Sequence, residues 1–205
     1  MKQLIIFPFN GNGLEALDAV GGQFEFVGFA DDTISKQGHH PLGFQVFGRE
    51  VFELYPEAMV LAVPGSPTSF TVRNEIIKAL GLPDERFATL VHPRAVVSSF
   101  AQLGINTLIM AGVVITSNAV VGNHVCVLPN SVIHHDSSVG DYTLIGSNVT
   151  IAGNTHVGEF CYIGSGTSII NGVTVGNNVL IGMGTNVIKS LASGVKAVGN
   201  PAKLL

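Results

Sequence analysis

The chain has 205 residues, of which 12% are charged, and its formal net charge is −4 at pH 7. Ten Lys and Arg residues provide no basic surface for nucleic acid, and the longest apolar run, residues 108–115, is far shorter than the roughly 18 residues of a membrane-spanning helix. The two cysteines show no metal-ligand spacing and the N-terminus shows no signal-peptide pattern, so we expect a cytoplasmic protein that binds neither nucleic acid nor a membrane.

The first ninety residues are predicted to form a small α/β domain. Apolar runs bounded by turn residues predict strands at 3–9, 24–29, 58–63 and 87–91, and a short helix at 14–20. A second helix is expected to begin at Ser66-Pro67, because Ser is a favoured N-cap and Pro a favoured first helical residue. Its inward-facing residues are expected to be Val72, Ile76, Ile77 and Leu80.

The turn after the first strand is a candidate nucleotide-binding loop. It contains Gly11 and Gly13, but Ala16 stands where the dinucleotide-binding fingerprint has its third glycine, so an ordinary strand-to-helix turn fits equally well. Asp31 and Asp32 follow the second strand, at the edge where ligands of open α/β sheets bind. Residues 1–92 are therefore predicted to be a Rossmann-like domain that binds a nucleotide.

From Leu103 to Val187, every sixth residue is Leu, Ile or Val, without interruption. A period of six is not a multiple of 3.6, which excludes an amphipathic helix as its source. It is the period of a parallel β-helix, in which three short strands form one coil of 18 residues and each repeated aliphatic residue points into the core. We call these aliphatic positions the hexad positions, and we expect this second domain to span residues 93–205.

The hexads, together with the tail Gly199-Asn200-Pro201-Ala202-Lys203, resemble the hexapeptide acyltransferases, which use acyl-coenzyme A and fold as left-handed β-helices. The α/β domain in front and the segment Ile133-His134-His135-Asp136 narrow the likeness. They resemble the bacterial nucleotide-sugar N-acetyltransferases of the bacillosamine and perosamine type and the related sialic acid O-acetyltransferases. Left-handedness is implied by this resemblance alone, since generic parallel crossovers are right-handed.

The resemblance implies catalytic roles for two adjacent residues. His135 matches the general base of the family, and Asp136 matches the acidic residue paired with its imidazole. Histidine accepts protons near neutral pH, and a neighbouring carboxylate fixes its tautomer and stabilises the imidazolium. Gly153 matches the glycine whose backbone N–H receives the thioester carbonyl of acetyl-CoA, and it lies one 18-residue coil after His135.

The binding residues are also carried over from the family. Gly11, Gly13, Asp31 and Asp32 match the loop and acidic pair that hold the nucleotide, and Asn12 between the two glycines is a further candidate for substrate binding. His134 is expected to line the substrate site or a subunit contact. Lys189 and Lys203 are candidates for contacts with the coenzyme A phosphates, although a short basic tail is as often merely solvated.

Three departures from the family pattern leave open the nucleotide contacts and any help given to the catalytic base. Asn12 stands where the family's glycine loop often has histidine, and Phe7-Pro8-Phe9-Asn10 replaces a run of smaller residues. Leu144 occupies a position where relatives carry a second active-site histidine.

These observations predict an acetyl-CoA-dependent N-acetyltransferase that acetylates the amino group of a nucleotide-linked, UDP-bound amino-deoxy sugar. Acetylation of a sugar hydroxyl by the same machinery is the nearest alternative, and a non-catalytic scaffold is a third. Zinc chemistry of the γ-carbonic anhydrase type needs two histidines in H-x4-H spacing, and the chain has no such pair, so no metal is expected.

We expect a homotrimer with active sites between neighbouring β-helices, because the flat faces of so short a β-helix are usually covered by cyclic association. The segment Asn123-His124 and the region of His134 are expected to meet the adjacent subunit. A single histidine on the outside of a β-helix, such as His124 or His156, is otherwise expected to be solvated.

Overall fold

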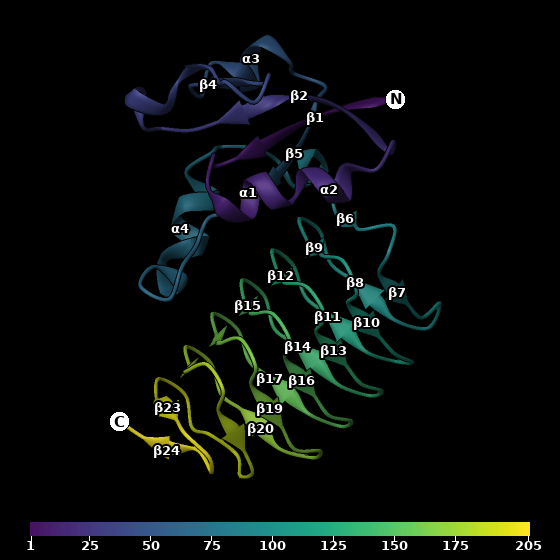
Figure 1. Ribbon diagram of the computed structural model, residues 1–205, viewed down its shortest axis with the longest axis vertical. Coiled ribbons are helices and arrows are strands. Elements are labelled where there is room, and N and C mark those ends of the chain that lie inside the picture. The colour runs from purple at the N-terminus through teal and green to yellow at the C-terminus, as the bar shows by residue number, and fades with distance from the viewer.

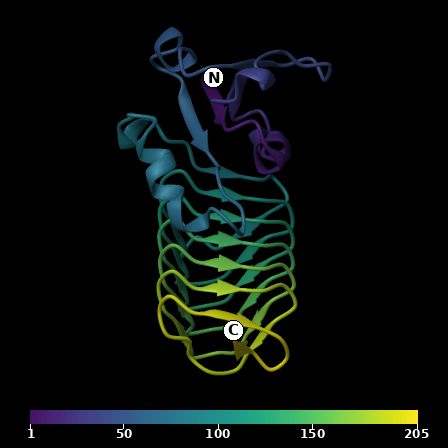
Figure 2. The same cartoon turned by 90° about the vertical axis from the view of Figure 1, so that its left-hand side faces the viewer.

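The computed structural model describes all of residues 1–205. An α/β unit is followed by a parallel β-helix whose coils are stacked along one axis, with the C-terminus at the far end (Figure 1). Figure 2 shows the coils as a column beneath the N-terminal unit. None of the helices has both the length and the apolar character needed to cross a bilayer.

The N-terminal sheet has five strands in the order β3-β4-β2-β1-β5. Their bounds are β1 Lys2–Phe7, β2 Phe24–Ala30, β3 Gly38–His39, β4 Gln45–Phe47 and β5 Met59–Ala62. All neighbours are parallel except β3 and β4. Because β2 and β5 lie on opposite sides of β1, the strand order reverses at the carboxyl end of β1, where open α/β sheets bind ligands. The prediction of a Rossmann-like α/β unit is confirmed.

The helices of this unit are short. They are α1 Gly11–Glu15, α2 Leu17–Val20, α3 Val51–Leu54 and α4 Arg73–Lys78, with 3-10 turns η1 Ile34–Lys36, η2 Phe70–Val72 and η3 Asp84–Arg86. The first helix begins earlier than the expected residue 14, because the Asn10 side-chain oxygen accepts a hydrogen bond from the Gly13 N–H at 2.7 Å and caps α1.

The prediction that a helix begins at Ser66 is wrong. The Ser66 hydroxyl lies 2.9 Å from the hydroxyls of both Thr68 and Ser69, and this local cluster forms a turn in place of a helix cap. The helical segment begins at η2, and Val72 is exposed there instead of facing inward.

The β-helix has three faces, each a parallel ladder of short strands. Face 1 contains β6 Leu90–Val91, β9 Leu108–Ile109, β12 Cys126–Val127, β15 Leu144–Ile145, β18 Tyr162–Ile163, β21 Leu180–Ile181, β23 Lys196–Val198 and the antiparallel end strand β24 Lys203–Leu204. Face 2 contains β7 Val96–Val97, β10 Val114–Ile115, β13 Val132–Ile133, β16 Thr150–Ile151, β19 Ser168–Ile169 and β22 Asn186–Val187. Face 3 contains β8 Gln102–Leu103, β11 Val120–Val121, β14 Ser138–Val139, β17 His156–Val157 and β20 Thr174–Val175.

The strand expected at 87–91 divides between the two units. Leu90 and Val91 form β6, which pairs with β9 in the β-helix, while Phe87 makes only an isolated bridge to Val60 of the N-terminal sheet. The first coil therefore begins slightly before residue 93.

The hexad positions lie inside the coils, as predicted. All of them are buried except Leu103, which is half-buried in the first coils. The third residue after most hexad positions has positive φ and is usually Asn, Asp or Gly, the residues that tolerate this conformation. Each coil therefore turns at residues whose side chains suit the turn.

Three consecutive coils depart from this rule at the corner between faces 3 and 1. His124, Tyr142 and Phe160 have positive φ, which is uncommon for bulky side chains. Their rings are stacked nearly parallel, with centroid separations of 4.5 Å and 5.3 Å. Packing between the rings offsets the backbone cost of these turns.

A fully buried arginine ties this corner to the N-terminal unit. The Nη1 atom of Arg73 donates to the carbonyl oxygens of His124 at 2.6 Å and Tyr142 at 2.9 Å, and its Nε donates to the carbonyl oxygen of Pro64 at 2.5 Å. Burial lowers the pKa of Arg73 to about 10, which leaves it protonated at neutral pH. Buried apolar residues of both units also form one continuous core, which includes Leu61 and Leu108.

His124 lies inside this junction, so the expectation that it is solvated or meets another subunit is wrong. The Asn106 side chain binds both backbone polar groups of Ala62, and its Nδ2 atom also lies 2.9 Å from Nδ1 of His124. Because Nδ2 is a donor, His124 must accept with an unprotonated Nδ1. Burial and the nearby Arg73 charge lower the pKa of His124 to about 4.

We expect Arg73→Met to lower the free energy of unfolding by about 2–4 kcal/mol, because three buried carbonyl groups lose a charged donor. Chemical denaturation of the variant measures this change. Arg94→Met, at an exposed arginine, is the matched control and should change stability by less than about 0.5 kcal/mol. Equal small effects of both substitutions would contradict the role given to Arg73.

His124 predicts a pH dependence of stability. Its folded pKa lies below the unfolded value of about 6.5, so the unfolded chain takes up the proton first, and the stability that the neutral ring contributes is lost as pH falls from 6.5 to 4. His124→Phe keeps an aromatic ring but has no titratable group. The wild type should have the higher melting temperature at pH 6.5, and its advantage over the variant should shrink as pH falls to 4. A difference that stays constant would refute the assignment.

Candidate functional site

His135 and Asp136 lie at the corner between faces 2 and 3, directly after β13. The Nδ1 atom of His135 is 2.7 Å from Oδ2 of Asp136, which confirms the predicted contact. On the preceding coil, Nδ2 of Asn118 donates to the other carboxylate oxygen at 3.1 Å. The sequence interpretation did not include Asn118, although subtracting one coil of 18 residues from Asp136 leads to it.

These two hydrogen bonds decide which nitrogen of His135 is free. The bonds from His135 and Asn118 lower the pKa of Asp136, so its carboxylate is ionised and acts as an acceptor. The proton shared with it therefore resides on Nδ1 of His135, and Nε2 presents an unshared electron pair. The side chain of His135 is 58% exposed, so Nε2 is open to a ligand.

Gly153 lies directly beneath the imidazole. A β-carbon at residue 153 would stand 2.8 Å from both Cε1 and Nε2 of His135, so the ring occupies space that only glycine leaves free. The φ of Gly153 is not in the left-handed region, so glycine is not needed here for the turn. It is needed because a side chain would collide with the His135 ring. The predicted stacking of these two residues is confirmed.

The backbone at this corner also differs from that of the corner between faces 3 and 1. At that corner, the N–H groups of Ile105, Asn123 and Glu159 are capped by side-chain oxygens from the next coil. At the His135 corner, the N–H groups of Ser117, His135, Gly153 and Asn171 make no hydrogen bond within the chain. Gly153 is buried beneath the His135 ring, and its N–H is one of those without a partner.

The same corner continues toward the C-terminus as a surface of mixed character. Asn171 and Lys189 follow Gly153 at intervals of one coil, and Ile170 and Ile188 beside them are 46% and 51% exposed. A cavity of about 150 Å³ lies at the end of this column, and its lining residues are Ile188, Lys189, Leu191, Pro201 and Ala202. Lys203 lies on the exposed end strand β24 and does not line it.

The two glycines of the N-terminal turn have different surroundings. A β-carbon at Gly13 would stand 2.5 Å from the Pro8 carbonyl oxygen, so Gly13 permits a close approach of α1 to the preceding loop. Its N–H is taken by Asn10. Gly11 has open space where a β-carbon would lie, and Asn12 is half-buried beside it.

Asp31 and Asp32 both form ion pairs within the chain. Asp31 is buried, and its carboxylate accepts from Nζ of Lys36 at 2.9 Å and from the Thr33 N–H. Burial opposes its ionisation, but these two donors outweigh that effect and hold the pKa of Asp31 below its ordinary value. Asp32 forms a two-point ion pair with Arg49, at 2.7 Å and 2.8 Å.

Lys36 and Arg49 were missed by sequence reasoning because the contacts join residues with no characteristic spacing. They place two cations at the edge of the sheet where ligands of this fold class bind. Any anionic ligand at this edge meets paired charges instead of two free carboxylates.

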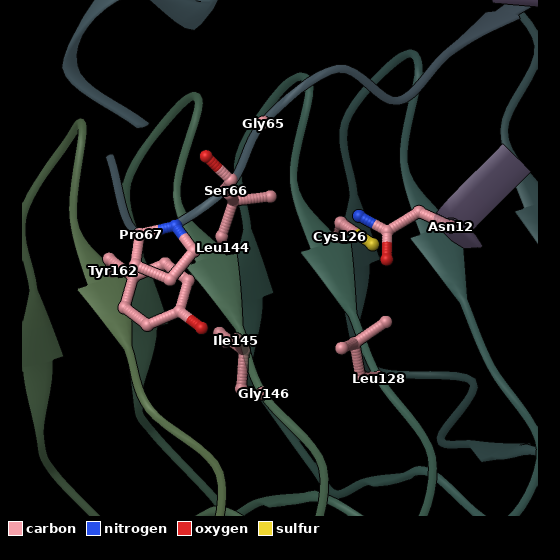
Figure 3. Close-up of a pocket in the computed structure, with 10 residues that line it drawn as sticks. All are labelled: Asn12, Gly65, Ser66, Pro67, Cys126, Leu128, Leu144, Ile145, Gly146 and Tyr162. Carbon is pink, nitrogen blue, oxygen red and sulfur yellow. The ribbon is translucent and has the colours of Figure 1, made fainter. Parts of the chain in front are cut away.

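A cavity of about 190 Å³ lies at the junction of the two units (Figure 3). Its lining comes from α1, from the loop after β5 and from face 1 of the β-helix: Asn12, Gly65, Ser66, Pro67, Cys126, Leu128, Leu144, Ile145, Gly146 and Tyr162. Burial raises the pKa of the Cys126 thiol to about 11, so this sulfur remains protonated and is a poor nucleophile.

The cavity and His135 lie on opposite sides of the chain. The cavity is built on face 1, whereas His135 lies at the corner between faces 2 and 3. In a three-sided coil that corner is opposite face 1. His134, half-buried at the same corner, is likewise absent from the cavity lining. No group of three or more His, Cys, Asp or Glu side chains is close enough together to hold a metal ion.

The repeat and the fold place this chain among proteins that carry the bacterial transferase hexapeptide. Residues 118–153 match the family model described as "Bacterial transferase hexapeptide (six repeats)". A stretch of 62 residues, 30% of this chain, is 39% identical to UDP-N-acetylbacillosamine N-acetyltransferase of Bacillus subtilis (strain 168). The aligned stretch spans about a quarter of the length of that curated relative, 27%.

Two solved structures are similar over the whole chain. The acetyltransferase domain of PglB from Neisseria gonorrhoeae FA1090, in complex with acetyl coenzyme A, is 28% identical, with 100% of this chain and 99% of that chain covered and a TM-score of 0.87. PerB from Caulobacter crescentus, in complex with CoA and GDP-perosamine, is 24% identical, covers 100% of this chain and 97% of its own, has a TM-score of 0.86 and shows the shared fold. The chain is thus similar, over its whole length, to solved structures of hexapeptide-repeat acetyltransferases.

Proposed function

We propose that this protein is an acetyl-CoA-dependent N-acetyltransferase that acetylates the amino group of a nucleotide-linked amino sugar. The observation that carries the proposal is the position of His135 Nε2 over Gly153, with Asp136 holding the opposite ring nitrogen. The relatives support the substrates: the PglB domain binds acetyl coenzyme A, PerB binds CoA and GDP-perosamine, and the Bacillus subtilis enzyme is named for a UDP-linked sugar.

The chemistry follows from three groups at the corner. The amine nitrogen of the sugar attacks the thioester carbonyl carbon, and a C–N bond forms while Nε2 of His135 takes the amine proton. The carbonyl oxygen gains negative charge and accepts a hydrogen bond from the N–H of Gly153, which has no partner within the chain. Collapse of this intermediate breaks the C–S bond, and the proton on His135 passes to the departing sulfur of coenzyme A.

Asp136 and Asn118 act on this reaction through His135. The ionised carboxylate of Asp136 stabilises the imidazolium that forms during the attack, and Asn118 fixes the orientation of the carboxylate. A histidine held by an oriented carboxylate in this way loses little freedom when the amine arrives.

Coenzyme A is proposed to lie along the column below Gly153. Three coil rises separate His135 from Lys189, ~14 Å at the strand spacing of a β-sheet, which is comparable with an extended pantetheine arm. The exposed Ile170 and Ile188 provide apolar contact for that arm, and Lys189 flanks the cavity at the C-terminal tail. We assign the phosphates to Lys189 and Lys203.

The nucleotide is proposed to bind at the carboxyl edge of the N-terminal sheet, near Gly11, Asn12 and Gly13. There Asp31 and Asp32 act together with Lys36 and Arg49, with which they are paired. UDP is our choice of nucleotide because of the Bacillus subtilis relative. Acetyl-CoA is a cytoplasmic metabolite, so we place the reaction in the cytoplasm.

The opposite locations of the cavity and His135 support a homotrimer. A sugar in the cavity of one chain is out of reach of His135 of that chain, whereas cyclic association brings face 1 of one subunit against the His135 corner of the next. Outward-facing Val96, Val114 and Val132 form an apolar column on face 2 beside this corner, and Val96 is 63% exposed. His134 would then meet the acceptor side of the shared site.

His135→Ala should lower kcat by about 10²–10⁴-fold, because general-base catalysis contributes that range. Steady-state kinetics with acetyl-CoA and a matched pair of acceptors, one with the amine and one with a hydroxyl in its place, measures the loss and also separates N- from O-acetylation. The Kd for coenzyme A should be unchanged. A variant with near wild-type kcat would show that His135 is not the base.

Mixed trimers test the sharing of the site. Leu128→Trp narrows the cavity and should abolish acceptor use, and His135→Ala removes the base. Co-refolding the two inactive variants should restore activity, because the cavity of one chain meets His135 of the other. If each chain works alone, the mixture stays inactive, as does each variant refolded by itself.

A further inference from the structure

The cavity at the junction holds no charged side chain, although it is lined by parts of both units. Leu128 and Leu144 make its floor apolar, and Cys126 contributes a protonated thiol. Pyrophosphate is bound most strongly by cationic side chains, and this lining has none. A neutral ring with one apolar side fits these walls, and the hexose is the neutral part of a sugar nucleotide.

Two polar side chains face this space without a partner in the chain. Asn12 and Tyr162 make no side-chain hydrogen bond, whereas the Ser66 hydroxyl is engaged by Thr68 and Ser69. Figure 3 shows Asn12 and Tyr162 entering from opposite ends of the cavity, with the leucines between them. A ligand that spans the cavity therefore meets one polar side chain without a partner at each end.

Neighbouring strands of face 1 and the ring of Phe70 hold Tyr162 in place. It lies on β18, where Leu144 and Leu180 are its paired neighbours on the coils before and after it. Its ring also packs against Phe70, at a centroid distance of 6.1 Å. The ring is half-buried by these contacts, while its hydroxyl oxygen points into the cavity beside Ile145 (Figure 3).

The two ends of the cavity define the direction of the ligand. Asn12 belongs to α1 and to the segment 11–13 that we propose for the nucleotide, so the ring carbon that bears the diphosphate lies at that end. The edge of the hexose opposite the diphosphate then lies at Tyr162, and we place the reacting amine and its neighbouring hydroxyl on that edge.

We propose that Tyr162 is a specificity-determining residue whose hydroxyl forms a hydrogen bond with the ring hydroxyl next to the reacting amine of the hexose. This inference rests on the proposed function and adds to it the part of the sugar that the protein recognises. A single such bond contributes a modest share of affinity, and it orients the amine toward the incoming thioester.

The test measures binding, so it does not depend on turnover. Calorimetry with UDP-N-acetylbacillosamine should give a Kd about 3- to 10-fold higher for Tyr162→Phe than for wild type, the range expected for one neutral hydrogen bond. With the analogue that lacks the hydroxyl next to the amine, the two proteins should bind equally. The Kd for coenzyme A should be the same in both.

Tyr142→Phe is the matched control, because it removes a hydroxyl from a tyrosine in the aromatic stack outside the cavity. It should leave every Kd unchanged. Three results would each overturn the inference: wild type and Tyr162→Phe bind the full sugar equally, their difference persists with the analogue, or wild type does not bind the sugar. Acetylation without a Tyr162 effect would overturn this inference alone, whereas binding with a Tyr162 effect but no acetylation would overturn the proposed function alone.

Discussion

The guanidinium of Arg73 is the contact on which the rest of the arrangement depends. It is fully buried, it has no carboxylate partner, and its three hydrogen bonds join Pro64 to the carbonyl groups of two neighbouring coils. A buried charge of this kind is costly unless its donors are satisfied, so the loop after β5 and the upper coils are held at one separation. Gly65, which lines the cavity, lies against both Arg73 and Leu144, so the same contact positions one wall of the cavity.

A second constraint comes from the coil itself. Three short strands per turn place residues 18 apart in the same column, and they keep the three corners permanently apart. In our proposal the corner with His135 and Gly153 supplies the proton acceptor and the N–H without a partner, while face 1 and the N-terminal unit supply the cavity. Neither the His135 corner alone nor the cavity alone then brings the amine, the thioester and the base together. In our account the subunit contact completes the site, so assembly and activity are linked in one structure.

The hexad period was enough to predict the coils and the stacking of His135 over Gly153, because the repeat length alone decides which residues share a column. The same arithmetic leads to Asn118 and Tyr162 once the columns of Asp136 and Leu144 are known. Arg73 and the pairing of Asp32 with Arg49 were not predictable, since they join segments with no fixed spacing. The helix expected at Ser66 failed for a local reason: its hydroxyl bonds to two neighbouring hydroxyls and closes a turn.

The most direct test of the shared site is a crystal structure with coenzyme A and the amino-sugar nucleotide bound. The account predicts a trimer in which the sugar lies in the cavity of one subunit and its amine lies within hydrogen-bond reach, roughly 2.6–3.2 Å, of Nε2 of His135 from another subunit. It also predicts the coenzyme sulfur near the Gly153 N–H of that second subunit. A sugar whose amine meets His135 of the same chain that encloses it, or a sugar bound away from the cavity, would contradict the account.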